Sequence, residues 1–202
     1  MALRPTRRPA GQGDAAPTTH EGTNAMNSPL AGATTVETPP AGDYYLNPQR
    51  STVSFTTRHM FGLGAVHGTF QLREAHIHVA DLVLASSARA TVGAATVRTG
   101  NPARDTAVRS AQLLDAEQHP DITFVSTSLI DVDGQWLLRG ELTVRGTTSS
   151  LDLKIEESRV VGSRLTLVAT TEVDRFDFGI TKMKGMVGRR LAMRLEIAAD
   201  RH

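Results

Sequence analysis

The most regular arrangement of reactive side chains is a histidine pair, His76 and His78, separated by one residue. In a β-strand two such residues share a face with Cα atoms roughly 7 Å apart, a spacing that suits a shared metal ion. Ile77 and Val79 form the opposite, apolar face, which puts the histidines on the outside of the sheet. Because no third ligand is evident nearby, we predict no metal site and interpret the pair as part of a solvated face.

A third histidine, His59, stands at the end of an alternating segment, before a glycine-containing apolar stretch at residues 60–62. Two interpretations are open. The imidazole could lie at the mouth of a pocket and form a hydrogen bond with the head group of a ligand. Alternatively, it anchors a loop and has no part in binding.

The neighbouring residues Arg104 and Asp105 could act as an anion clamp and a general base, which would make an enzyme. A structural ion pair that ties a helical insert to the rest of the domain is the interpretation that we favour.

The stretch from Asp174 to Asp177 places two carboxylates around Arg175. A glycosidase needs two acids across a cleft, and nothing in the sequence supplies that cleft. We therefore expect a cluster of salt bridges at a corner of the fold.

Residues 182–190 are basic and contain two methionines. Methionine suits adaptable apolar surfaces, and the cations could meet a phosphate or an anionic membrane. A solvated loop is the alternative that we favour.

Several classes of function are excluded by composition. The chain has no cysteine, which removes disulfides, thiolate zinc sites and a cysteine nucleophile. A net charge of +1, with one Trp, two Tyr and six Phe in no stacking arrangement, argues against nucleic acid as a partner. The sequence also lacks a phosphate-binding glycine loop and a nucleophile elbow. We expect neither a cofactor nor a nucleic-acid partner.

The elements that must position these side chains are strands. Residues 53–57 alternate between apolar and polar side chains, which is the period of a half-buried strand. Eight further runs show the same alternation: residues 66–72, 75–79, 88–95, 122–130, 136–144, 151–155, 165–173 and 191–197. In the run 122–130, the inward face is expected to hold Ile122, Phe124, Ser126, Ser128 and Ile130.

Local signals mark the connections between these strands. Asn101 and Pro102 are typical of a helix start, and residues 103–117 predict a short helix that ends before Pro120. Asp133 and Gly134 are a strong signal for a tight β-hairpin.

We therefore expect an all-β fold, an antiparallel β-barrel of about eight strands with a short helical insert. A sandwich would also satisfy the alternation, but a closed barrel leaves no exposed edges and can enclose one small ligand. The inward positions hold many small residues, which would leave room in the lumen: Gly68, Ala90, Ala94, Gly140, Ala169 and Thr171.

The N-terminal region differs in composition from the rest. Residues 1–42 hold six of the nine prolines and none of the aromatic residues, which predicts a disordered tail before a domain at residues 43–199. Met26 is a candidate for the natural start. Arg7 and Arg8 are followed by no apolar stretch, so we predict neither a signal peptide nor a membrane-spanning helix and expect a cytoplasmic protein.

Four segments, in this order, resemble the YceI-like, polyisoprenoid-binding family. They are residues 44–70 (YYLNPQRSTVSF, RHM and VHGTF), 99–124 (TGNPARD and HPDITF), 140–148 (GELTVRGTT) and 174–179 (DRFDFG). The family often has a tryptophan and an acidic residue where this chain has Tyr44 and Asn47, and His-Ser where it has Arg50 and Ser51.

The resemblance implies a lipocalin-like barrel that binds a long-chain lipid, such as a polyisoprenoid or an isoprenoid quinone. It also implies dimers in some members and export of many members. We expect a carrier or sequestration protein with a link to stress, and transient contact with a membrane surface. We expect the lipid tail along the inward side chains and the head group near two polar ones. The tail residues are Phe55, Phe70, Phe124, Leu142 and Phe178, and the head-group residues are His59 and Arg104.

Two alternatives remain open. The protein could be an enzyme that acts on a hydrophobic substrate in the same lumen, with Asp105 or His59 as acid or base. It could also be an interaction module with a filled barrel, whose basic, methionine-containing loop binds a partner.

Overall fold

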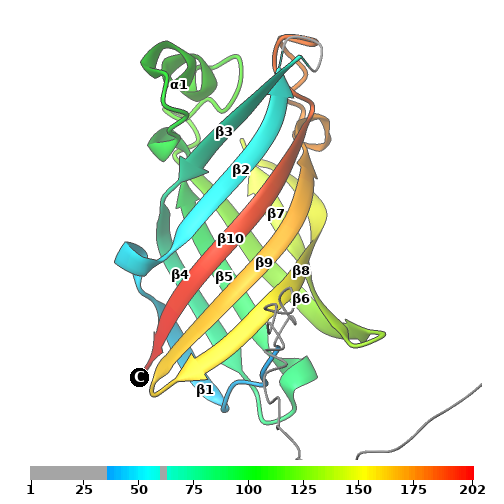
Figure 1. The fold of residues 1–202 in the computed structure, drawn as a ribbon. Coiled ribbons are helices and arrows are strands. Elements are labelled where there is room, and N and C mark those ends of the chain that lie inside the picture. Colours follow the sequence, from blue (N-terminus) through cyan, green and yellow to red (C-terminus); the bar gives the residue numbers. More distant parts are fainter. Residues whose placement is uncertain (1–35, 60–62) are drawn as a thin grey trace, which may run out of the picture. The chain divides into compact units, whose positions relative to one another are not determined.

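The computed structural model describes residues 36–59 and 63–202, which form an antiparallel β-barrel with one short α-helix (Figure 1). The predicted fold class is confirmed. The strands are β1 (Gly42–Leu46), β2 (Thr52–His59), β3 (Gly64–Phe70), β4 (Leu72–Val79), β5 (Ser87–Gly93), β6 (Asp121–Val132), β7 (Gln135–Val144), β8 (Thr147–Val161), β9 (Arg164–Asp174) and β10 (Arg190–Arg201). The helix is α1 (Pro102–Arg109), and the 3-10 helices are η1 (Pro48–Arg50), η2 (Val83–Ala85), η3 (Ala94–Thr96) and η4 (Arg175–Phe178).

Eight of the described strands close the barrel, in the order β1-β4-β5-β6-β7-β8-β9-β10, because β1 pairs with both β4 and β10. Strand β10 has two partners along its length. Its first half pairs with β2 at residues 191–196, and its last residues, 199–201, pair with β1. The β2–β3 hairpin therefore continues the wall beyond the closed ring, toward the end of the barrel that carries α1 (Figure 1).

Two β-bulges change which side chains face inward. The register of β6 against β7 shifts between Ser126 and Ser128, and beyond this point Leu129 is buried. The prediction that Ser128 and Ile130 continue the inward series was wrong, because the extra residue of a bulge moves all later side chains to the other face. A second bulge in β8 lies after Ile155, and beyond it Ser158 is fully buried.

Two inward glycines are filled by aromatic rings. A Cβ atom at Gly140 would lie 2.4 Å from the Phe124 ring, and one at Gly68 would lie 2.4 Å from the Phe55 ring. The expectation that these glycines leave room in the lumen was therefore wrong. Each makes space for a phenyl ring from the neighbouring strand, which would clash with any larger residue.

The connections follow their local signals in part. The Asn101 side chain accepts a hydrogen bond from the main-chain N–H of Arg104, as expected of a helix cap, and Asp133 and Gly134 both have positive φ, as a tight hairpin requires. The helix ends at Arg109 and not at residue 117. Ser110 caps the helix, and beyond it Leu113 packs into a buried cluster with Phe178.

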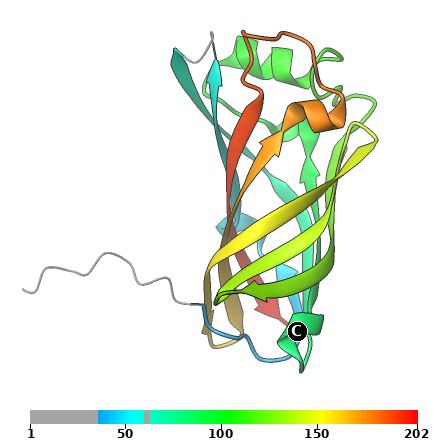
Figure 2. The ribbon, with the colours of Figure 1, turned by 90° about the vertical axis from the view of Figure 1, so that its right-hand side faces the viewer.

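The segment 36–42, which the sequence assigned to the tail, contacts the barrel. Val36 forms a parallel bridge with Ser158, the Ser158 hydroxyl donates to the Glu37 carbonyl at 2.6 Å, and the Tyr44 hydroxyl donates to the Pro40 carbonyl at 2.8 Å. Figure 2 shows this segment in blue, crossing the end of the barrel opposite α1. We call residues 36–41 the N-terminal strap. The remainder of the predicted tail, residues 1–35, lies outside the described residues.

None of the helices in the described part of the chain is long and apolar enough to cross a lipid bilayer.

Candidate functional site

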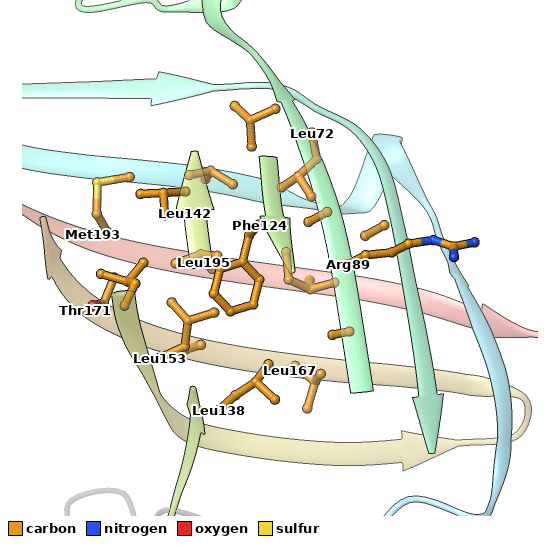
Figure 3. A pocket seen from close by; sticks show the side chains of 18 of the residues that line it. Leu72, Arg89, Phe124, Leu138, Leu142, Leu153, Leu167, Thr171, Met193 and Leu195 are labelled. Atoms are coloured by element: carbon orange, nitrogen blue, oxygen red, sulfur yellow. The ribbon is translucent and has the colours of Figure 1, made fainter. Parts of the chain in front are cut away.

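The inward faces of the strands enclose a cavity of about 270 Å³, here called the barrel cavity. It extends from Pro39 of the N-terminal strap to Phe178 and Ile180 at the α1 end, and its surface is almost wholly apolar. Figure 3 shows leucine side chains from several strands around the ring of Phe124. Among the residues in that view that line the cavity are Leu72, Leu138, Leu142, Leu153, Leu167, Thr171, Met193 and Leu195.

A second cavity, here called the vestibule, adjoins the first at the α1 end and has a volume of about 310 Å³. Its walls come from β2 and β3, from α1, and from the segment between η4 and β10, residues 179–189, which we call the basic loop. The two cavities share a wall, because five residues line both of them: Phe70, Leu114, Arg175, Ile180 and Leu191.

The five predicted tail residues divide between these cavities. Phe124, Leu142 and Phe178 line the barrel cavity, Phe55 lines the vestibule, and Phe70 lines both. The rings of Phe55 and Phe70 lie 5.4 Å apart at their centroids. All five predicted tail positions therefore line one or both of two adjoining, mainly apolar cavities.

Arg104 lines the vestibule, where its guanidinium binds Thr99 and not Asp105. Its Nε donates to the Thr99 hydroxyl oxygen at 2.8 Å and Nη2 donates to the Thr99 carbonyl at 3.2 Å. The Thr99 hydroxyl in turn donates to Asp105 at 2.6 Å, and the Thr99 main-chain N–H donates to the same carboxylate at 2.8 Å. Arg104 and Asp105 therefore do not form the predicted direct ion pair. Both bind Thr99, and these hydrogen bonds tie α1 to the preceding segment.

These contacts keep Asp105 ionised. The hydrogen bond from the Thr99 hydroxyl lowers the pKa of the Asp105 carboxyl most, and Arg109 and Arg104 lower it further, against the opposing effect of burial. A general base works best with a pKa near the working pH, and a carboxylate with a lowered pKa and two hydrogen bonds to its Oδ1 atom is poorly suited to that role.

Arg175 lines the candidate site, although the sequence did not assign it to a ligand-binding site. It is only 5% exposed, lines both cavities, and directs its guanidinium at main-chain carbonyls of the basic loop. Nε donates to Gly188 at 2.9 Å, Nη1 to Lys182 at 2.8 Å and also to Ile180, and Nη2 to Val187 at 3.2 Å. Burial lowers the pKa of this guanidinium, and the nearby Asp174 opposes that effect.

The prediction of a salt-bridge cluster around Arg175 was therefore wrong about this arginine, whose guanidinium binds main-chain carbonyls. Asp174 instead accepts a hydrogen bond from Arg189 at 2.6 Å and caps η4 by accepting from the Phe176 N–H at 3.0 Å. Arg175 sits in a cage of neutral carbonyls, which hold the basic loop over the end of the barrel. A pattern of apolar alternation gives no signal for such a cage, because its acceptors are main-chain atoms.

Three histidines that the sequence singled out remain. His59 ends β2, but its side chain and residues 60–62 lie outside the described residues, so its predicted head-group contact stays a prediction. His76 and His78 lie on the outer face, where their Nε2 and Nδ1 atoms are 2.7 and 3.0 Å from Asp43 Oδ1. Hydrogen bonds from His78 and His76 lower the pKa of the Asp43 carboxyl. Within the described ranges no group of three or more His, Cys, Asp or Glu residues is arranged to hold a metal ion.

A closed eight-stranded barrel with an apolar interior cavity is a lipocalin-like β-barrel with space for one small apolar ligand. The family model of the YceI-like domain matches residues 44–199, so the chain belongs to the YceI-like family.

Relatives and solved structures agree with this assignment. A UPF0312 protein of Ectopseudomonas mendocina is 30% identical over 170 residues, which are 80% of this chain and 88% of that protein. Protein YceI of Escherichia coli O157:H7 is 30% identical over 126 residues, or 60% of this chain and 63% of the relative. BcnA of Burkholderia cenocepacia has the same fold with a TM-score of 0.68 at 19% identity, covering 76% of this chain and 98% of BcnA. A polyisoprenoid binding domain from Saccharophagus degradans gives a TM-score of 0.62 at 12% identity, covering 79% of this chain and 98% of that domain.

Proposed function

We propose that the protein binds a long-chain amphiphilic lipid, a polyisoprenoid or an isoprenoid quinone, and acts as a carrier or sequestration protein. The tail occupies the barrel cavity and the head group lies in the vestibule. The observation that carries this proposal is the pair of adjoining cavities, one almost wholly apolar and the other provided with guanidinium groups. The similarity to the polyisoprenoid binding domain of Saccharophagus degradans supports the choice of ligand class.

Burial of the tail supplies the binding free energy. Each CH₂ group moved from water into an apolar site contributes about 0.8 kcal/mol, so a five-carbon isoprene unit contributes about 4 kcal/mol before the loss of chain freedom is subtracted. The barrel cavity offers almost no polar atoms, so it favours hydrocarbon over any polar ligand of the same size. The length of tail that fits therefore decides the affinity.

The vestibule would orient the head group. Among the described residues its lining includes Thr57, Thr99, Arg104 and Arg175 but no carboxylate, so these side chains favour a ligand group that accepts hydrogen bonds. The Arg104 guanidinium has neutral partners on Thr99 and would gain from such an acceptor. A quinone carbonyl or a phosphate would satisfy this requirement.

Binding and catalysis can be separated. We propose a binding protein and not an enzyme, because the carboxylate of Asp105, one of the two residues considered for catalysis beside His59, is held by Thr99. The barrel cavity also argues against an interaction module with a filled lumen. A cytoplasmic location, a dimeric state and a link to stress stay predictions.

Lipid extraction of the purified protein followed by mass spectrometry, together with titration of an isoprenoid quinone, tests the proposal. Leu142→Trp places a larger side chain in the barrel cavity and should lower quinone affinity at least tenfold, whereas Glu141→Trp on the exposed face of the same strand should not. Thermal melting checks that both variants fold. Absence of a co-purified amphiphile together with no quinone binding to the unsubstituted protein would refute the proposal.

A further inference from the structure

Both ends of the barrel carry exposed apolar side chains. At the vestibule end, Leu63 is 88% exposed and Met186 of the basic loop is 60% exposed. At the other end, Leu82 beside η2 and Val161 of the β8–β9 hairpin are each 70% exposed. Figures 1 and 2 show α1, the β2–β3 tip and the basic loop at one end, and the β8–β9 hairpin and η2 at the other. Exposed apolar area alone therefore does not distinguish the two ends.

Charge does distinguish them. The stretch 182–190 carries four basic residues, Lys182, Lys184, Arg189 and Arg190, and no acidic one. Both lysines are exposed, and the two arginines stay more than half exposed although they pair with Asp174 and Glu172. At the opposite end two exposed apolar residues have acidic neighbours, since Asp81 precedes Leu82, and Asp131 and Asp133 flank Val132, whereas Val161 lies between Arg159 and Arg164 in the sequence. An anionic surface would therefore be attracted to the basic stretch at the vestibule end more than to the acidic turns that carry Leu82 and Val132.

The basic loop is held in place and does not hang freely. The Arg175 guanidinium binds the carbonyls of Ile180, Lys182, Val187 and Gly188, so the main chain of the loop curves around a buried cation. This arrangement leaves the Lys182 side chain exposed, since only its carbonyl is used.

The loop is also joined to the β2–β3 hairpin. The Thr57 hydroxyl of β2 donates to the Arg190 carbonyl at 2.7 Å, and a Cβ atom at Gly188 would lie 2.0 Å from the same hydroxyl. Leu63 follows in the turn of that hairpin, where His59 pairs with Gly64. Lysines, Met186 and Leu63 thus surround the same end of the barrel as the vestibule.

We propose that this surface, formed by the basic loop and Leu63, docks the protein on an anionic phospholipid bilayer, so that the vestibule faces the membrane. The lysines bind lipid head groups and Leu63 enters the apolar boundary of the bilayer. This inference rests on the proposed function, because a membrane-facing vestibule would bring the ligand space next to the bilayer that holds the proposed lipid. Met186 lines the vestibule and is exposed as well, so the docking surface is continuous with the ligand space.

Co-sedimentation with vesicles tests the inference. The protein should bind phosphatidylglycerol-containing vesicles more tightly than pure phosphatidylcholine vesicles, and high salt should weaken this binding. Each basic residue near such a surface contributes about fivefold in the binding constant, so Lys182→Gln with Lys184→Gln should lower vesicle binding about 20- to 30-fold. Leu63→Ser should lower it on both kinds of vesicle. The matched control, Leu82→Ser in the acidic turn at the opposite end, should have no effect.

Titration with a detergent-solubilised isoprenoid quinone separates this inference from the proposed function. Neither lysine side chain nor Leu63 lines a cavity, so these variants should bind quinone normally. Equal binding to both kinds of vesicle, or equal loss in the Leu82 control, would overturn the docking surface while quinone binding still stood. Vesicle binding without any quinone binding would instead refute the lipid-carrier function.

Discussion

Replacing Arg175 by methionine should destabilise the basic loop more than any other single change at the vestibule end. Methionine keeps an apolar side chain of similar length but removes donors from four main-chain carbonyls. Lys182 is exposed, so its carbonyl can turn to water, whereas Ile180 is 5% exposed and would keep an unsatisfied acceptor. One buried unsatisfied carbonyl costs about 1–3 kcal/mol, and the weakened contacts of the others add to this, so we expect a loss of about 2–4 kcal/mol.

Urea unfolding measures this loss, and hydrogen exchange shows where it acts. The amides of the basic loop, including Val187, should exchange faster in Arg175→Met, while those of β6 and β7 should keep their relative protection. Arg189→Met is the matched control, because this exposed arginine pairs with Asp174 at the surface and should cost less than about 1 kcal/mol.

A lysine at position 175 separates charge from geometry. Lysine keeps the positive charge but has a single ammonium group, which cannot reach four carbonyls arranged around a planar guanidinium. We expect Arg175→Lys to recover less than half of the lost stability. Full recovery in the lysine variant, or an unchanged unfolding midpoint in the methionine variant, would refute the carbonyl-cage argument.

Three further predictions follow from the described contacts. Gly140→Ala should destabilise the fold by about 1–3 kcal/mol and weaken quinone binding, because the new methyl group displaces the Phe124 ring toward the barrel cavity; calorimetry and titration measure both. Removing residues 1–41 should lower the melting temperature, whereas removing residues 1–35 should not, since only the first deletion removes the contacts of the N-terminal strap with Ser158. The folded-state pKa of Asp105 is lowered, so its stabilising contribution is present above the unfolded pKa of about 3.9 and is lost as the pH falls through the folded value. Asp105→Asn should therefore flatten the acid limb of the stability curve in urea melts, and an unchanged acid limb would contradict that assignment.

Much of the architecture could be predicted because its signals are local. Alternation of apolar and polar residues follows from strand geometry, so the inward series through Leu167, Ala169 and Thr171 could be recognised before any partner strand was known. Positive φ at Asp133 and the cap at Asn101 depend on a few adjacent residues. The same alternation placed Phe124 and Leu142 on the lumen side.

The rest depends on segments that are distant in the sequence. A bulge after Ser126 appears only when β6 pairs with β7, and it is this pairing that turns Leu129 inward. The space beside Gly140 could not be recognised as filled without knowing that Phe124 lies on the neighbouring strand.

At the vestibule end of the barrel, too, some features could be predicted from the sequence and others could not. The sequence by itself determined antiparallel strands with one apolar face each, which favour a barrel, and a basic stretch near the C-terminus. Only the tertiary structure decided that Arg175 is buried, that it holds this loop by its carbonyls, and that it lines both cavities. The physical reason is that hydrophobic periodicity is a property of each strand, whereas the cage joins η4 to main-chain acceptors several residues away that carry no sequence signature.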